Sequence, residues 1–160
     1  MPSITIAAAV AKDRVIMWHE VPNGKWNGDA AASMYEQAMK PALARIWPGL
    51  TRYIVVEDGD RKGNMSGKGT AAKSRAKITA MTLPPRTPSL MPLDYAIWHR
   101  IMQGLASSAP KGRESREAFC ERLRRQATSL PRGYVRSVIA KMPENIRAIV
   151  SAKGYTPKND

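Results

Sequence analysis

Short apolar runs separated by turn residues characterise the first part of the chain. Most residues at positions 4–10 and 15–21 are apolar or small, and the four residues between them, 11–14, suit a hairpin turn. Two further apolar runs, at positions 52–56 and 78–83, have the length of strands. The pattern therefore predicts an antiparallel hairpin followed by two separate strands.

Helical periodicity fills the segments between these strands. Residues 30–47 carry an apolar stripe, Asp29 is placed to cap the first turn, and Pro41 should kink or restart the helix. A small helix is expected over residues 70–77, after a glycine-rich loop. Because a helical crossover joins them, the two later strands should pair in parallel.

The chain changes character after Leu105. Residues 106–112 form a linker rich in Ser, Ala, Pro and Gly, and residues 113–129 then have the spacing of a charged amphipathic helix. Pro131 opens a further helix, as proline does at a first helical position, Pro143 interrupts this helix, and Gly154 ends it. The pattern predicts a helical extension behind an α/β region.

Charge is the strongest compositional feature. The 160 residues include 26 Lys and Arg against 13 Asp and Glu, giving a net charge of +13 and a pI near 10.3. Such an excess favours a polyanionic partner, and nucleic acid is the expected one.

No apolar run approaches the roughly 20 residues of a membrane span. With 43% hydrophobic residues the chain can build one core, and the lone Cys120 excludes an internal disulfide.

Two carboxylates are candidates for a metal-binding site. Asp58 follows the strand at residues 52–56, and Asp94 opens an apolar helix after a proline-rich loop. Acidic residues on separate elements in basic surroundings can hold metal ions against a phosphodiester. Asp58 also suits a simple turn with Gly59, and Asp94 suits a first helical turn. Glu57 and Asp60 are interpreted as solvated neighbours, although either could help to hold an ion.

These two segments resemble a known family. Residues 86–98, Arg-Thr-Pro-Ser-Leu-Met-Pro-Leu-Asp-Tyr-Ala-Ile-Trp, resemble the "SPDLNPxE/D…W" signature of mariner-type transposases of the DDE/D superfamily. Residues 55–60, Val-Val-Glu-Asp-Gly-Asp, resemble the strand end that carries the second catalytic Asp of that family. Pro131 to Val135 and Ala152 to Gly154 are similar to its C-terminal helices.

The resemblance implies a ribonuclease H-like α/β fold with a mixed sheet that lacks its first strand, followed by C-terminal helices. The absent strand should leave a gap or an altered pairing in the sheet. Residues 1–105 would form the ribonuclease H-like domain and residues 106–160 the helical extension. Asp58 and Asp94 would be the catalytic and metal-binding residues, with Mg²⁺ or Mn²⁺ as cofactor. The family would cut and join DNA as a homodimer, in the nucleus of a eukaryote or otherwise in the cytoplasm.

One departure from the family pattern affects activity. Asp13 and Asp29 are the only aspartates before Glu57, and both suit turn or capping positions rather than that of the first catalytic acid. Two-metal cleavage needs carboxylates that hold two ions about 4 Å apart, whereas two carboxylates suffice for one Mg²⁺. We therefore expect weak or absent cleavage. The alternatives are a non-catalytic nucleic-acid-binding protein derived from a transposase and an inert transposon relic.

Other motifs are weaker. Residues 63–70 are similar to a phosphate loop, but they depart from it in two features: the number of residues between the glycines, and the residue that follows Lys68. These departures exclude a nucleotide site. His19, His99 and Cys120 lack zinc-site spacing. Basic residues around the acids are predicted to contact the DNA backbone: Arg61, Lys62, Lys68, Lys73 and Arg86.

Overall fold

The computed structural model describes residues 4–154, and it begins with the hairpin that the sequence predicts. Strands β1 (Ile6–Ala11) and β2 (Arg14–Glu20) are neighbours in one sheet, and a two-residue connection makes them antiparallel. Lys12 in the turn adopts a φ of 56°. The Val21 amide donates to the Thr5 carbonyl at 2.9 Å, which extends the pairing to the open end.

A helical segment with a wide central turn follows the hairpin. It consists of a 3-10 turn (Pro22–Gly24), α1 (Gly28–Ser33), a π-helical stretch η2 (Met34–Met39) and α2 (Lys40–Ile46). Pro41 stands in the first turn of α2, but Met39 and Lys40 before it keep helical dihedrals, so the helix continues into α2 without the expected restart. The expected cap is wrong: the Asn27 side chain, not Asp29, accepts the Ala30 amide at 2.9 Å. Asp29 lies inside the first turn, where its charge suits the helix dipole.

The strand–helix–strand unit has the predicted parallel pairing. Strand β3 (Tyr53–Glu57) pairs with β4 (Ile78–Thr82) in register from Tyr53 opposite Ile78 to Glu57 opposite Thr82. Helix α3 (Gly67–Ala76) makes the crossover and is capped by Ser66, whose hydroxyl accepts the Gly69 amide. Within residues 4–154 the β1–β2 and β3–β4 pairs remain separate two-stranded sheets, consistent with the expected gap.

Helices dominate the rest of the chain. Short turns at Pro88–Leu90 (3-10, η3) and Leu93–Ile97 (π, η4) lead into the last four helices, which are α4 (Trp98–Ser107), α5 (Arg116–Thr128), α6 (Arg132–Ala140) and α7 (Met142–Ser151). Ser115 caps α5, and its hydroxyl accepts the Ala118 amide at 3.1 Å. Pro131 stands immediately before α6, as predicted.

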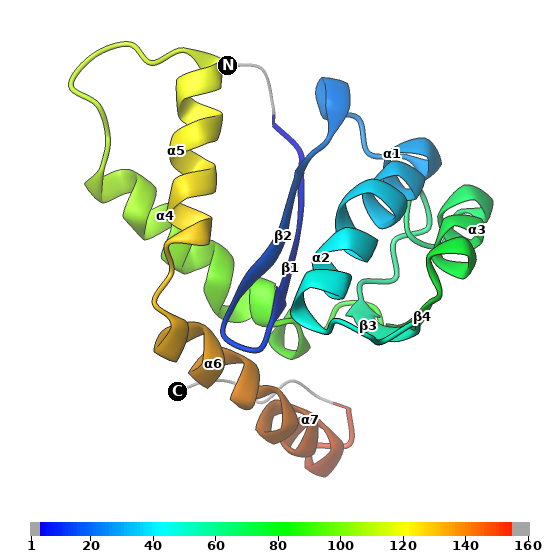
Figure 1. The fold of residues 1–160 in the computed structure, drawn as a ribbon. Coiled ribbons are helices and arrows are strands. Elements are labelled where there is room, and N and C mark those ends of the chain that lie inside the picture. Colours follow the sequence, from blue (N-terminus) through cyan, green and yellow to red (C-terminus); the bar gives the residue numbers. More distant parts are fainter. Residues whose placement is uncertain (1–3, 155–160) are drawn as a thin grey trace. The chain divides into compact units, whose positions relative to one another are not determined.

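The chain divides into two compact units. The first holds β1 up to Ala9 and the chain from Ile16 to Arg86, with Tyr35 fully buried in its core. The second holds the hairpin tip Val10–Val15 and the chain from Thr87 onward. Its α4 and α5 lie side by side (Figure 1) around a core that includes Ile101. The predicted boundary between an α/β domain and a helical extension at residue 105 stays a prediction.

Candidate metal and nucleic-acid site

Asp58 follows directly after the last residue of β3 and is exposed to solvent. Its neighbour Glu57 is only 6% exposed, because the alternation of the strand turns it toward the interior of the first unit. The two adjacent carboxylates therefore have opposite environments. Asp58 remains accessible to an ion, whereas Glu57 belongs to the core.

Glu57 is held by a buried network of three side chains. Its carboxylate accepts hydrogen bonds from the Tyr35 hydroxyl and from the ammonium of Lys73, which is 8% exposed. The Lys73 ammonium also lies 5.3 Å from the centre of the Tyr35 ring. Burial and the adjacent Glu57 carboxylate both raise the pKa of Tyr35 above its ordinary value. Since a buried charge is costly without its partner, this network fixes the end of β3.

Asp60 fixes the loop on the other side of Asp58. Its carboxylate accepts the indole N–H of Trp26 at 2.6 Å and the backbone amide of Gly63 at 2.7 Å. A Cβ at position 63 would clash with the Trp26 ring, so this close approach requires glycine. Burial alone would raise the pKa of Asp60, but the hydrogen bonds from Trp26 and the loop amides outweigh it and lower that pKa.

Asp94 lies in the second unit, in the first turn of the π-helical segment Leu93–Ile97, and is exposed. Helix α6 anchors this segment through the Tyr95 hydroxyl, which donates to the Val138 carbonyl at 2.5 Å. Helix α7 anchors the preceding turn, where the Asn145 amide donates to the Ser89 carbonyl at 2.8 Å. Asp94 is therefore presented on a braced segment, as Asp58 is in the first unit.

Each predicted metal ligand is thus exposed on a fixed segment of its own unit. Among residues 4–154, no group of three or more His, Cys, Asp and Glu side chains is placed to hold a metal. The joint metal site of Asp58 and Asp94 stays a prediction.

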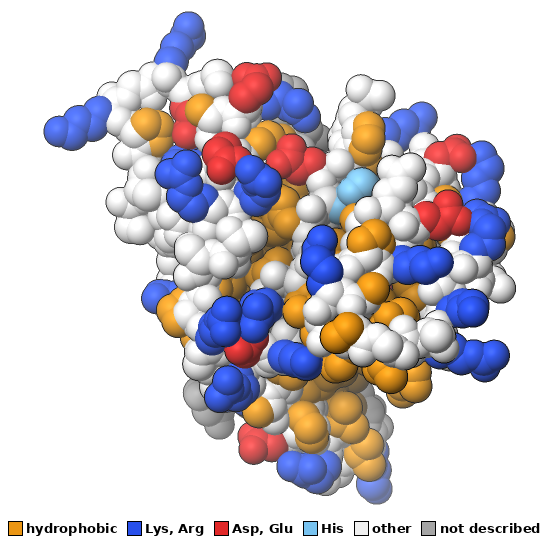
Figure 2. Space-filling view, viewed as in Figure 1, with side chains coloured by type: hydrophobic (Ala, Val, Ile, Leu, Met, Phe, Trp, Pro, Cys, Tyr) orange, Lys and Arg blue, Asp and Glu red, His pale blue; other side chains and the backbone are white. Residues whose placement is uncertain are grey.

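The basic residues proposed for DNA contact fall into two classes. Arg61, Lys62 and Arg86 are exposed, and Lys68 is exposed while pairing with Asp29 at 2.6 Å. The prediction for Lys73 is wrong, because its ammonium is buried against Glu57 and is out of reach of a phosphate. Figure 2 shows Lys and Arg side chains spread over the visible face rather than gathered in one spot. No described helix is both long and apolar enough for a membrane span.

The sequence carries signals for the buried network in its apolar periodicity. Glu57 shares the alternation of Tyr53, so a period of two already places it on the buried face. Lys73 belongs to the helical stripe Gly69, Ala72, Lys73 and Ala76, all of which are buried in α3. Charge alone had suggested solvated positions for both residues, and the hydrophobic period was the better guide.

Comparison with known proteins gives one consistent result. No protein-family model and no curated protein matches the chain. Among solved structures, the catalytic domain of Mos1 mariner transposase superposes with a TM-score of 0.83 at 17% identity, covering 97% of this chain and 76% of that one. The chain has the fold of a mariner transposase catalytic domain. A Mos1 paired-end complex with the left transposon end gives a TM-score of 0.79 at 18% identity, covering 95% of this chain and 44% of that one.

The mariner catalytic-domain fold agrees with the sequence resemblance described above. The motif segments around Asp58 and Asp94 occupy a strand end and a helix start, the two contexts that the resemblance requires. The fold prediction, a ribonuclease H-like α/β arrangement with C-terminal helices, is confirmed.

Proposed function

We propose that the chain is a DNA transposase-type catalytic domain that binds DNA and holds Mg²⁺ or Mn²⁺ through Asp58 and Asp94. The observation that carries this proposal is the mariner catalytic-domain fold over 97% of the chain, together with exposed acids on both motif segments. Solved structures of similar fold include Mos1 with Mn, with Mg and in transposon DNA complexes, which supports the same ligand classes here.

The acidic residues would bind the metal ion, and the exposed basic residues would bind the DNA backbone. Asp58 and Asp94 supply anionic oxygen ligands, which Mg²⁺ and Mn²⁺ prefer over nitrogen or sulfur. The bound ion would polarise the scissile phosphodiester and activate the attacking oxygen. Exposed cations, among them Arg61 and Lys62 beside Asp58, would hold the DNA backbone by charge-assisted hydrogen bonds.

The supports of Asp58 matter because a metal ligand needs a fixed direction. Glu57, the residue before Asp58, is held in the core by Lys73. Asp60, in the loop after Asp58, is held by Trp26. Ligands held in place by packing and hydrogen bonds lose less entropy when they bind an ion. Glu57 and Asp60 are both engaged in these bonds, so we propose that neither serves as a substitute ligand.

Cleavage by this chain is proposed to be weak. Two carboxylates suffice to hold one Mg²⁺, whereas efficient phosphodiester cleavage uses two ions about 4 Å apart. The second candidate function is therefore non-catalytic nucleic-acid binding, which the net charge of +13 favours. Homodimer formation and a nuclear location in a eukaryote remain proposals that follow from the family resemblance.

One experiment separates these functions. The purified chain is incubated with supercoiled plasmid and Mg²⁺ or Mn²⁺, while a gel shift with duplex DNA is run at low and high salt. We expect salt-sensitive binding with little sequence preference and at most faint nicking. Nicking that disappears in Asp58→Asn and Asp94→Asn would establish the enzyme. Binding without any nicking would support the non-catalytic protein, and no binding even at low salt would refute both functions.

A further inference from the structure

We propose that a groove in the second unit, between α4 and the corner that joins α5 to α6, binds one phosphodiester segment of DNA. The inference deepens the proposed function, since it rests on DNA being the partner and names a surface that holds it. The groove residues lie on elements other than the Leu93–Ile97 segment that carries Asp94. It would act as an anchoring contact rather than as part of the metal site.

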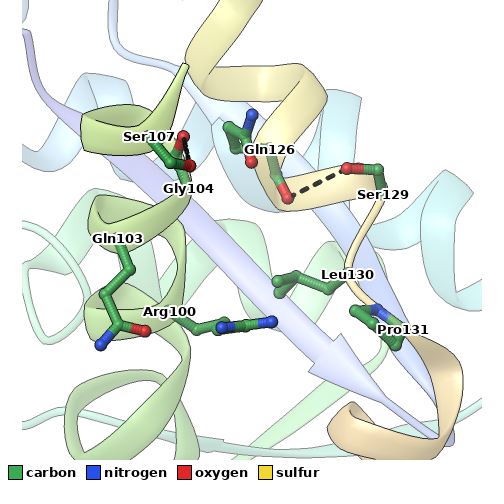
Figure 3. A pocket seen from close by; sticks show the side chains of 8 residues that line it. All are labelled: Arg100, Gln103, Gly104, Ser107, Gln126, Ser129, Leu130 and Pro131. Atoms are coloured by element: carbon green, nitrogen blue, oxygen red, sulfur yellow. Dashed lines mark hydrogen bonds between the residues drawn. The ribbon is translucent and has the colours of Figure 1, made fainter. Parts of the chain in front are cut away.

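The groove is a cavity of about 510 Å³ with a mainly polar wall. Figure 3 shows Arg100 extending from α4 toward Leu130 and Pro131 on the opposite side. Eight residues line it: Arg100, Gln103, Gly104, Ser107, Gln126, Ser129, Leu130 and Pro131. The lining contains one permanent cation and no acid, and its free uncharged donors are carboxamides, because the hydroxyls of Ser107 and Ser129 already donate to the Gly104 and Gln126 carbonyls. This combination suits an anionic ligand that also accepts several hydrogen bonds.

Arg100 supplies the charge. It is exposed, and no carboxylate of residues 4–154 lies within ion-pair distance of it. Its guanidinium lies 5.8 Å from the centre of the Tyr134 ring of α6, which limits its motion while leaving its N–H donors available. A guanidinium held in this way can bind two phosphate oxygens at once.

The two carboxamides supply further donors. The Gln126 amide donates to the Ser108 hydroxyl at 3.3 Å, and the Gln103 amide lies 2.9 Å from the His99 ring. Each carboxamide carries two N–H groups, so a donor remains on both. Gly104 leaves the space in which the Gln126 carboxamide lies, because a Cβ there would clash with it. Glutamine amides are common donors to the phosphates of nucleic acids.

Charges beside the groove extend the attraction. Arg132 follows Pro131, and both Arg132 and Arg136 remain more than half exposed while lying 3.9 and 3.7 Å from Asp13 at the hairpin tip. These long contacts leave most of each guanidinium in water. Asp13 is the acid beside these two arginines, and the first turn of α6 adds no other. A backbone that crosses the groove would therefore run past several exposed cations, as a DNA strand requires and a single small anion does not.

The test measures binding of a fluorescent 20-base-pair duplex to the full chain by anisotropy over a salt series. Arg100→Ala removes the cation, and Gln103→Glu places a negative charge in the groove without changing the volume much. Arg147→Ala is the matched control, since Arg147 is an exposed arginine of the same unit on α7, which does not line the groove. We expect about fivefold weaker binding for either groove variant, a salt slope reduced by about one for Arg100→Ala, and less than about twofold loss for the control.

The outcomes are distinguishable. Losses from Arg100→Ala that match those from Arg147→Ala, with wild-type binding intact, would overturn the groove and leave the proposed function standing. Inorganic phosphate that binds the wild type and is lost in Arg100→Ala, while the duplex affinity of that variant is unchanged, would also overturn it, in favour of a small-anion site. A wild-type chain that fails to bind duplex would refute the proposed function as well. Helical circular dichroism checks folding, and if Arg100→Ala unfolds, the result of Gln103→Glu decides.

Discussion

Glu57 and Lys73 are a buried ion pair whose stability depends on both members. With both side chains largely removed from water, the loss of hydration is offset by their mutual attraction, by the Tyr35 hydroxyl and by the Tyr35 ring beside the ammonium. Removing one charge leaves the other buried without a partner, whereas neutralising both leaves no buried charge. The pair adjoins Asp58, so its state also affects the direction of a metal ligand.

Changing Glu57→Gln should destabilise the fold by about 3–5 kcal/mol, because the Lys73 ammonium is then buried without a counter-charge. The double variant Glu57→Gln with Lys73→Met removes that ammonium and should recover most of the loss. Urea unfolding of the wild type, both single variants and the double variant gives the coupling energy. Additive losses would show that the two groups are independent.

The lowered pKa of Asp60 predicts a dependence of stability on acid. Because the folded pKa lies below the ordinary value of about 3.9, the ionised carboxylate stabilises the fold above that pH. This contribution is lost as the pH falls through the folded value. Asp60→Asn keeps an acceptor for Trp26 but cannot titrate, so its free energy of unfolding should vary less below about pH 4. Equal acid dependence in both proteins would contradict the assignment.

Local sequence patterns predict where the site residues lie along the chain, but they do not predict the contacts between residues far apart in sequence. The positions of Asp58 and Asp94 at a strand end and a helix start follow from local apolar patterns and from the motif. The hydrogen bond from Trp26 to Asp60 joins residues 34 positions apart, and no local pattern predicts such a contact. The same holds for Tyr35 and Glu57, 22 positions apart.

At the scale of elements, proline and capping residues decide where helices begin. The π-helical stretch Met34–Met39 precedes Pro41, which lacks an N–H and cannot join the ladder of the preceding turn. A second π-helical segment, Leu93–Ile97, follows Pro92. Apolar spacing predicts such helices but not their wide turns, since the stripe of a single π turn differs little from that of an α-helix.

The correction at the start of α1 gives a direct test. Asn27→Ala removes the side chain that accepts the Ala30 amide and should cost about 1 kcal/mol. Asp29→Ala removes an exposed contact with Lys68 and should cost no more than about 0.5 kcal/mol. Chemical unfolding of the two variants side by side measures the difference. A larger loss for Asp29→Ala would restore Asp29 as the cap.

Pairing of strands was predictable where the connection is short and local. A two-residue turn forces the β1–β2 hairpin, and the α3 crossover makes β3 and β4 parallel. The division of residues 4–154 into two separate sheets does not follow from apolar spacing, because the spacing within a strand does not say which other strand it pairs with.

For the whole molecule, the proposed metal site would draw one ligand from each of the two units. Asp58 belongs to the first and Asp94 to the second, and the positive charge is spread over both. A metal ion that uses both carboxylates would link the units, so its binding energy would stabilise the folded chain as a whole. If each carboxylate instead bound its own ion, each ion would stabilise its own unit and would not link the two units.

Mg²⁺ or Mn²⁺ at about ten times its dissociation constant should stabilise the wild type by about 1.4 kcal/mol, which corresponds to a rise of about 3–5 °C in Tm. If one ion needs both acids, Asp58→Asn and Asp94→Asn should each abolish the whole rise. If each acid binds its own ion, each variant should keep about half. Thermal unfolding with and without the ion, with Asp29→Asn as a control for an exposed carboxylate elsewhere, distinguishes the two cases. Because the removal of a carboxylate can itself change stability, the shift caused by metal is compared within each variant, and an undiminished shift in Asp94→Asn would refute the shared site.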